Sequence, residues 1–204
     1  MDRKPAWERP RVGLGDPILK DIAKTLADLG LEQGEGDFLG LWKDRNRFNI
    51  PGPIYVGDDD DCGTGPLAAP NNVCLPGRTD EMHFLPEELG PYGGEFVFRQ
   101  PSTMFELDQV VEAAATNAVG AYALDGDDYW TAQMVQEWWD AMHPFREASL
   151  RALERFDGDT RKDPRKMGRI WPTANFRRWI DWLDAGAESY LELYLAYLDR
   201  RRRG

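Results

Sequence analysis

Hydrophobic residues recur at helical spacing near the beginning of the chain. Asp16 and Pro17 supply an N-cap and a first helical residue, and Gly30 supplies an end. The apolar positions between them are Ile18, Ile22, Leu26 and Leu29. This spacing of three or four residues predicts an amphipathic helix from about residue 17 to 29.

Two longer helical patterns occupy the last third of the chain. Thr131 is the expected N-cap of the first, which runs to about Phe156, and Pro144 predicts a kink or a restart near His143. The second runs from Thr173 to about Arg200, although Gly186 weakens its middle. Its apolar stripe is Phe176, Ile180, Leu183, Ala187, Tyr190, Leu191, Tyr194 and Leu198. The chain is therefore expected to carry a long C-terminal amphipathic helix.

The middle of the chain carries two short apolar runs of strand composition, at residues 95–99 and 118–124. Thr103 and Glu106 form a capping-box pattern that opens a helix between them. Strand, helix and strand predict a βαβ unit with parallel pairing and a right-handed crossover. The expected fold class is α/β, with mixed α+β as the alternative. The small sheet would be flanked by helices and accompanied by a long irregular segment rich in glycine and proline.

Length and composition set the domain organisation. The chain has 204 residues, of which 42% are hydrophobic and 12% aromatic, and this is ample for a core. Residues 1–15 are rich in proline and charge and are expected to form a flexible leader. Residues 16–204 are expected to form a single globular domain.

The charge excludes several classes of protein. A formal net charge of −11 and a pI of about 4.7 argue against a nucleic-acid-binding surface, which needs a basic face. No window approaches 18 consecutive apolar residues, so no membrane span is expected. The N-terminus lacks the apolar core of a secretory signal, and two cysteines do not make a disulfide framework. We expect a cytoplasmic protein.

The irregular segment between Phe48 and Asp128 gathers residue types that can carry chemistry. Cys62, Cys74 and His83 could supply zinc ligands, but their separations of twelve and nine residues match no zinc-binding spacing. Neither the run at residues 58–61 nor the cluster of Asp125, Asp127 and Asp128 has the ligand spacing of an EF-hand loop. The run Asp58-Asp59-Asp60-Asp61 is best interpreted as a solvated acidic turn, with a cation or partner site as the alternative. No metal and no cofactor are predicted.

Two functions of different classes fit these observations. The first is an acidic cytoplasmic protein-interaction module for a basic protein partner, for example a bacterial immunity or inhibitor protein that neutralises a basic toxin or effector. Acidic residues would steer association and tryptophans would anchor the contact. The predicted partner-binding residues are Asp58, Asp59, Asp60, Asp61, Asp127, Trp130 and Trp139.

The second function is a small-molecule enzyme or ligand-binding protein. Ligands of open α/β sheets often bind at the carboxyl edge of the strands, where Arg99 would clamp an anion and an aspartate would act as base. The candidate residues for this strand-edge pocket are His83, Arg99, Asp125 and Asp128. None of them forms a complete catalytic motif, and no G-x-S-x-G or phosphate-binding glycine pattern is present.

Overall fold

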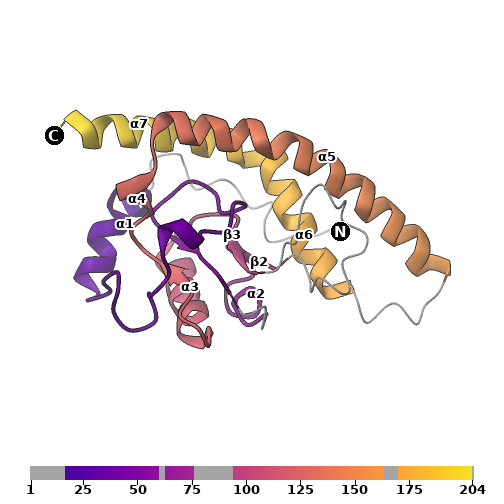
Figure 1. Cartoon of the computed structure of the whole chain (residues 1–204), viewed down its shortest axis with the longest axis horizontal. Coiled ribbons are helices and arrows are strands. Elements are labelled where there is room, and N and C mark those ends of the chain that lie inside the picture. The colour runs from indigo at the N-terminus through magenta and orange to yellow at the C-terminus, as the bar shows by residue number, and fades with distance from the viewer. Residues whose placement is uncertain (1–16, 60–62, 76–93, 163–169, 204) are drawn as a thin grey trace, which may run out of the picture.

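The computed structural model describes residues 17–59, 63–75, 94–162 and 170–203 (Figure 1). The predicted leader at residues 1–15 lies outside the described residues. So do four residues that the sequence singled out, namely Asp60, Asp61, Cys62 and His83.

Two small antiparallel sheets lie at the centre of the fold. Strand β1 (Tyr55–Val56) pairs with β4 (Tyr122–Ala123), and β2 (Val73–Cys74) pairs with β3 (Phe96–Val97). The expected parallel pairing of β3 with β4 is wrong. Strand β4 has β1 on one side and the segment around Gly40 on the other, because Gly40 N donates to Tyr122 O at 2.9 Å. Both edges of β4 are therefore occupied, and β3 pairs with β2 instead.

Buried amide side chains extend these two-residue strands. Asn49 donates from Nδ2 to Val56 O at 2.7 Å, and its Oδ1 accepts from the N–H groups of Val56 and Val97 at 3.0 and 2.8 Å. Gln100 exchanges hydrogen bonds with both backbone groups of Ile54. Buried backbone groups need such partners, so the two amides complete a hydrogen-bond pattern that longer strands would otherwise supply.

Helices surround the sheets, and the mixed helix and sheet content of the predicted fold is confirmed. The shorter helical elements are α1 (Pro17–Asp28), η2 (Trp42–Asp44), α2 (Gly65–Ala68), α3 (Met104–Thr116) and α4 (Gly126–Tyr129). Helix α1 begins at Pro17 as predicted, and Gly30 follows its end with a φ of 69°. At the start of α3, Thr103 Oγ1 accepts from Glu106 N at 3.1 Å, as the capping pattern predicts.

Helix α5 (Ala132–Lys162) is continuous through Pro144, so the helix does not restart near His143, and it extends beyond the expected end at about Phe156. Thr131 caps it as expected, since its Oγ1 accepts from Met134 N at 3.2 Å. Beyond the proline, Ala148 and Leu153 are buried against the core. Packing of this second half offsets the hydrogen bond that Pro144 cannot donate.

The long C-terminal helix is confirmed and contains a π-helical turn. It consists of α6 (Ile170–Trp182), the π-turn η5 (Leu183–Ala187) and α7 (Glu188–Arg203), and all eight residues of the predicted stripe are buried. Figure 1 shows α5 and α7 running along one side of the molecule, away from α2 and α3. Residues of the π-turn and of α5 line one pocket, so the π-turn lies next to α5.

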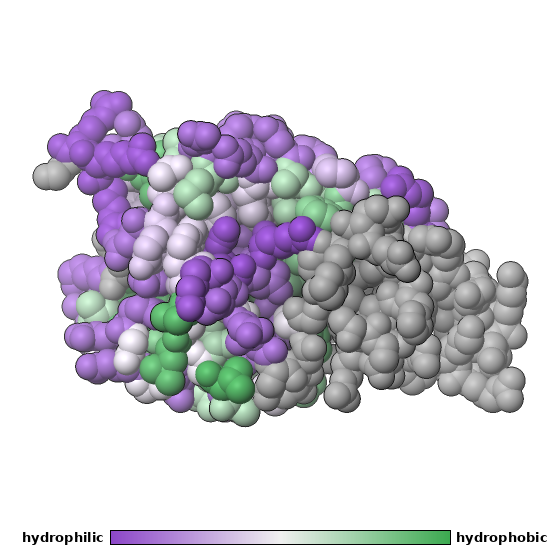
Figure 2. Space-filling model, viewed as in Figure 1, coloured by the Kyte–Doolittle hydropathy of each residue, from purple (hydrophilic) through white to green (hydrophobic). Residues whose placement is uncertain are grey.

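The described surface is largely hydrophilic on the face that Figure 2 shows, with small separate hydrophobic spots at its lower edge. The large hydrophobic side chains that are exposed are Leu29, Leu39, Leu41, Leu67, Met104, Phe105, Val119 and Tyr129. A hydrophilic surface of this kind agrees with the share of charged residues in the chain, which is 30%.

Candidate functional site

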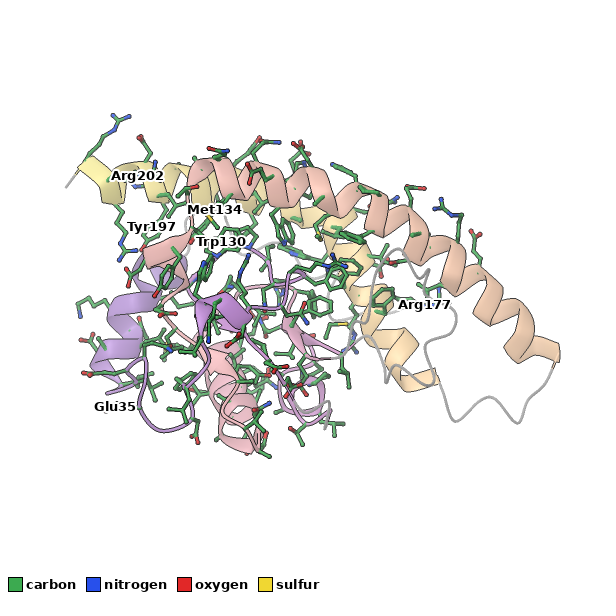
Figure 3. The ribbon with its side chains drawn as sticks, viewed as in Figure 1. Glu35, Trp130, Met134, Arg177, Tyr197 and Arg202 are labelled. Atoms are coloured by element: carbon green, nitrogen blue, oxygen red, sulfur yellow. The ribbon has the colours of Figure 1, made fainter. Side chains whose placement is uncertain are left out.

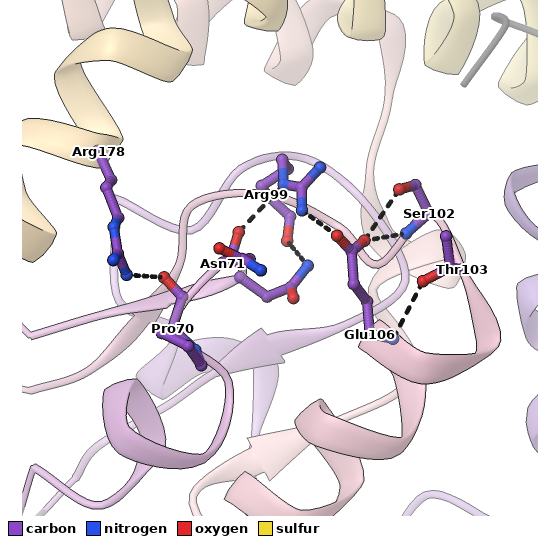
Figure 4. A network of polar contacts seen from close by, with 8 residues as sticks. Pro70, Asn71, Arg99, Ser102, Thr103, Glu106 and Arg178 are labelled. Atoms are coloured by element: carbon purple, nitrogen blue, oxygen red, sulfur yellow. Dashed lines mark hydrogen bonds and ion pairs between the residues drawn. The ribbon is translucent and has the colours of Figure 1, made fainter. Parts of the chain in front are cut away.

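Arg99, a candidate for the predicted strand-edge pocket, is engaged in holding the start of α3. Its Nε donates to Asn71 O at 3.0 Å, and its Nη2 forms an ion pair with Glu106 (Figure 4). Glu106 also accepts from the backbone and hydroxyl of Ser102 at 2.8 and 2.9 Å. The guanidinium therefore ties the loop after α2 to the first turn of α3.

The other strand-edge candidates have different neighbours. Asp125 accepts from Tyr55 OH at 2.8 Å, and Asp128 pairs with Arg201 at 2.6 Å. In the described part of the chain, no contact joins Arg99 to either aspartate, and His83 lies outside it. The described geometry thus does not bring these candidates together, because β3 and β4 belong to different sheets.

The predicted acidic partner surface is partly internal. Asp58 is exposed, whereas Asp59 is half-buried and accepts from Asn117 Nδ2 at 2.6 Å and from Glu95 N at 3.1 Å. Asp59 therefore holds the loop before α2 to two other segments instead of forming a solvated turn. Asp60 and Asp61 lie outside the described residues.

Asp127 and Trp130, which the sequence also assigned to partner binding, are buried. The Asp127 carboxylate accepts from Tyr194 OH at 2.6 Å and from Tyr197 OH at 2.7 Å, so it ties α4 to α7. Burial raises the pKa of this carboxyl, although both phenol hydrogen bonds act in the opposite direction. Figure 3 labels Trp130 and Tyr197 near the start of α5. A partner would have to contact the surface around these residues.

Trp139, the last predicted partner-binding residue, lines a pocket between α5 and η5. The pocket has a volume of about 380 Å³. Helix α5 contributes an aromatic and basic wall, and η5 with the start of α7 contributes carboxylates. Its polar and aromatic lining consists of Trp139, His143, Arg146, Asp184, Glu188 and Ser189. We take this α5–η5 pocket as the candidate functional site.

An ion pair crosses one side of the α5–η5 pocket. Arg146 grips Asp184 with two nitrogens, Nε and Nη2, and the second of these bonds is 2.7 Å long. The hydrogen bond that Arg146 donates to Asp184 raises the pKa of the guanidinium, and Glu147 adds a further carboxylate at 2.5 Å. Glu188 is exposed, and no described residue donates to its side chain. The pocket thus keeps one carboxylate free.

The aromatic wall of the α5–η5 pocket comes from helical spacing. Trp139 and His143 are four residues apart on α5, and their rings meet edge to face with centroids 4.7 Å apart. Trp139 is half-buried and His143 is exposed. One aromatic ring is therefore held in place by another while both remain open to the pocket.

The wall of the pocket opposite Trp139 and His143 is formed by the π-turn η5. A π-turn inserts one extra residue into a helix and often marks a functional site. Gly186 within it faces the ring of Trp182 so closely that a Cβ there would lie 2.1 Å from Trp182 Cζ3. Glycine is required because only a residue without a side chain fits beside this indole.

Sequence reasoning missed Arg146, Asp184 and Glu188. Two features of the sequence could have indicated this pocket. They are the pair Trp139 and His143 at helical spacing and Gly186 inside a long helical pattern. Among the described residues, no three histidine, cysteine or acidic side chains are placed to hold a metal ion. No described helix is both long and apolar enough to cross a membrane.

Comparison of the chain with protein-family models, with curated proteins and with solved structures finds no match. The function must therefore be argued from the geometry and electrostatics of the chain.

Proposed function

We propose that this protein is an acidic protein-interaction module that binds a basic protein partner through the α5–η5 pocket. The observation that carries the proposal is the pairing of the half-buried Trp139 ring with the unpaired, exposed carboxylate of Glu188 in one pocket. A lysine or arginine of the partner would find a ring face and a counter-charge together.

The surroundings of the pocket support a cationic anchor. Asp184 lines the pocket together with Glu188, and Arg146 bridges Asp184 to Glu147. A carboxylate has about four lone-pair sites, so both can accept a further donor without releasing Arg146. The net charge of −11 would add long-range steering of a basic protein toward this surface.

An inhibitor of a basic toxin or effector, acting like a bacterial immunity protein in the cytoplasm, is the concrete form of this proposal that we favour. Such a protein needs a stable scaffold, an anchoring pocket and carboxylates that confer fast association. It needs no catalytic group, and the described residues that could have formed the strand-edge enzyme site are each engaged with structural neighbours.

The test compares two charge reversals of equal size. Glu188→Lys alters the pocket, and Asp108→Lys alters an exposed position on α3, at the other side of the molecule (Figure 1). The wild-type chain and both variants are immobilised and exposed to an extract of the native host at low and at high salt. The captured protein is then purified, and its affinity for each chain is measured.

A basic protein that binds wild-type and Asp108→Lys chains equally, and Glu188→Lys at least tenfold more weakly, would support the proposal. Its affinity should fall as salt rises, since exposed charge pairs are screened. Equal loss of affinity in both variants would mean that only net charge matters, and it would remove the pocket from the proposal. Absence of any basic partner would overturn the proposed function itself.

A further inference from the structure

A second constellation lies around Arg45, the residue that follows η2. The Cζ atom of Arg45 is 4.2 Å from the ring centroid of Trp42 and 4.4 Å from that of Trp130. Two indoles, whose rings also meet each other edge to face at 5.3 Å, thus contact one guanidinium in a favourable cation–π arrangement. None of these three residues lines the α5–η5 pocket.

The nitrogen atoms of this cluster lack acceptors. Nε and Nη1 of Arg45 and Nε1 of Trp130 are buried, and each has no hydrogen-bond partner. Arg45 is the only described arginine with buried guanidinium nitrogens in this state, and it forms no ion pair with any described carboxylate. Buried donors and buried charges normally have partners, because leaving them without one costs free energy.

The carboxylate that this cluster reaches through Tyr55 is already hydrogen-bonded. Asp125 accepts the hydroxyl of Tyr55, and the Tyr55 ring contacts Trp42 edge to face at 5.4 Å. The Asp125 carboxylate therefore accepts a hydrogen bond from Tyr55 and forms no ion pair with Arg45. This leaves the guanidinium as an unopposed positive group in an otherwise acidic chain.

The cluster opens to the surface through one atom and an apolar rim. Nη2 of Arg45 is neither hydrogen-bonded nor among the buried unpartnered atoms, so it reaches the surface. A guanidinium grips a carboxylate with Nη2 together with either Nε or Nη1. Tyr129, which is 45% exposed, stacks on Trp42 at 4.9 Å, and Leu41 beside Trp42 is 52% exposed.

We propose that Arg45, Trp130 and Trp42 form a binding site for a carboxylate that is attached to an apolar or aromatic group. One carboxylate oxygen binds Nη2 at the surface, and the second binds Nε or Nη1 below it. Trp130 Nε1 donates to the same anion, and the apolar group lies against Tyr129 and Leu41. The ligand is either a free small acid or the C-terminal carboxylate of a peptide, since both present this chemistry.

The test uses benzoate as the probe and benzamide as its uncharged counterpart. Binding is followed by nuclear magnetic resonance through the indole N–H signal of Trp130, which Trp130→Phe identifies by removing it. We expect benzoate to shift this signal saturably and benzamide to leave it unchanged. N-acetyl-phenylalanine, which imitates a peptide C-terminus, distinguishes the two sources: tighter binding than benzoate assigns the peptide, and weaker binding assigns a free acid.

Matched arginine variants locate the anion. Arg45→Lys keeps the charge but loses the paired donors, and it should weaken benzoate binding at least tenfold. Arg47→Lys is the control, because Arg47 also stacks on rings, at 5.6 Å from Phe48 and 4.8 Å from Phe145, and its change should be less than twofold. A protective rise of the wild-type Tm with benzoate but not with benzamide tests the site even if Arg45→Lys does not fold.

Four results would overturn the proposal. One is equal binding of benzoate and benzamide, which would leave only an apolar contact. Another is saturable binding of inorganic phosphate in place of benzoate, which would make the anion something other than a carboxylate. The third is unchanged benzoate affinity in Arg45→Lys, which would place the carboxylate away from Arg45. The fourth is the absence of any saturable shift, which would mean that water alone satisfies the three donors.

Discussion

The buried carboxylate of Glu95 accepts a hydrogen bond of 2.9 Å from the hydroxyl of Tyr122, and neither side chain is exposed to solvent. Glu95 directly precedes β3, and Tyr122 lies in β4, so this bond joins the two sheets. The second oxygen of Glu95 accepts from Gly65 N, at the start of α2, at 2.8 Å. One carboxylate thus connects two sheets and a helix.

Removing the Tyr122 hydroxyl tests this connection. Tyr122→Phe keeps the ring but deprives a buried carboxylate oxygen of a donor, so we expect the free energy of unfolding to fall by about 1–3 kcal/mol. Urea denaturation followed by circular dichroism measures the change. The control is Tyr129→Phe, because Tyr129 is 45% exposed and its change should stay within about 0.5 kcal/mol. Equal effects of the two substitutions would mean that the Glu95–Tyr122 bond adds little.

The close packing of α4 on the loop before β1 leads to a second prediction. A Cβ at Gly126 would lie 2.1 Å from Gly52 O and 3.0 Å from Pro53 O, and these backbone atoms have little freedom to move. We expect Gly126→Ala to lower the free energy of unfolding by about 1–3 kcal/mol or more. Gly57→Ala is the matched control, because its Cβ would be 3.4 Å from the nearest atom, Ala121 O. Thermal unfolding measures the stability of both variants. A Gly126→Ala chain as stable as the Gly57→Ala chain would contradict the prediction.

These examples show which parts of the fold are readable from the sequence. Helical periodicity and capping residues are local signals, so the start of α1 at Pro17 and the buried stripe of the C-terminal helix were predictable. Strand pairing is not local. The partner of β4 depends on which segments reach its edges, and nothing in residues 118–124 indicates that β1 and the segment around Gly40 occupy them.

The candidate sites were harder to predict than the fold. A carboxylate in an acidic run is predicted to be exposed to solvent. Asp59 instead accepts a hydrogen bond from Asn117, a residue 58 positions away in the chain. Arg45 and Trp130 are likewise distant in sequence, so no spacing rule connects them. The position of Trp139 off the buried stripe of α5 was predictable from helical spacing, and Trp139 lines the α5–η5 pocket. The presence of Glu188 in the same pocket was not predictable, because Glu188 directly follows the π-turn.

The burial of Asp127 leads to a prediction about pH. Burial raises the pKa of this carboxyl above its usual value near 4. The folded protein therefore holds this proton at pH values where the unfolded chain has released it. Stability from this group is present at low pH and is lost as pH rises through the raised pKa.

The variant Asp127→Asn isolates this effect, because it cannot titrate. We expect the free energy of unfolding of the wild type, minus that of the variant, to decrease as pH rises from about 4 to 7. Urea denaturation of both chains at several pH values in this range gives the difference. A difference that increases with pH would show that the hydrogen bonds from Tyr194 and Tyr197 outweigh burial and that the pKa is lowered.

Cys74 lies in β2 with no exposed surface, and its chemistry follows from this position. Burial raises the pKa of its thiol well above the usual value, and the nearby carboxylate of Glu95 adds to the effect, while Arg178 opposes it. Because the thiolate is the reactive species, the native thiol should resist alkylation.

In a Cys62→Ala chain, where Cys74 is the remaining cysteine, we expect iodoacetamide at pH 8 to react with the native protein at least about tenfold more slowly than with the same protein in 8 M urea. Mass spectrometry at timed intervals measures both rates. The ratio also reports how often β2 opens, since a fully buried thiol reacts only after local or global unfolding. Tyr122→Phe, which weakens the Glu95 connection between the sheets, should raise the native rate more than Tyr129→Phe does. Similar native and unfolded rates would place the Cys74 thiol at the surface and contradict the core position of β2.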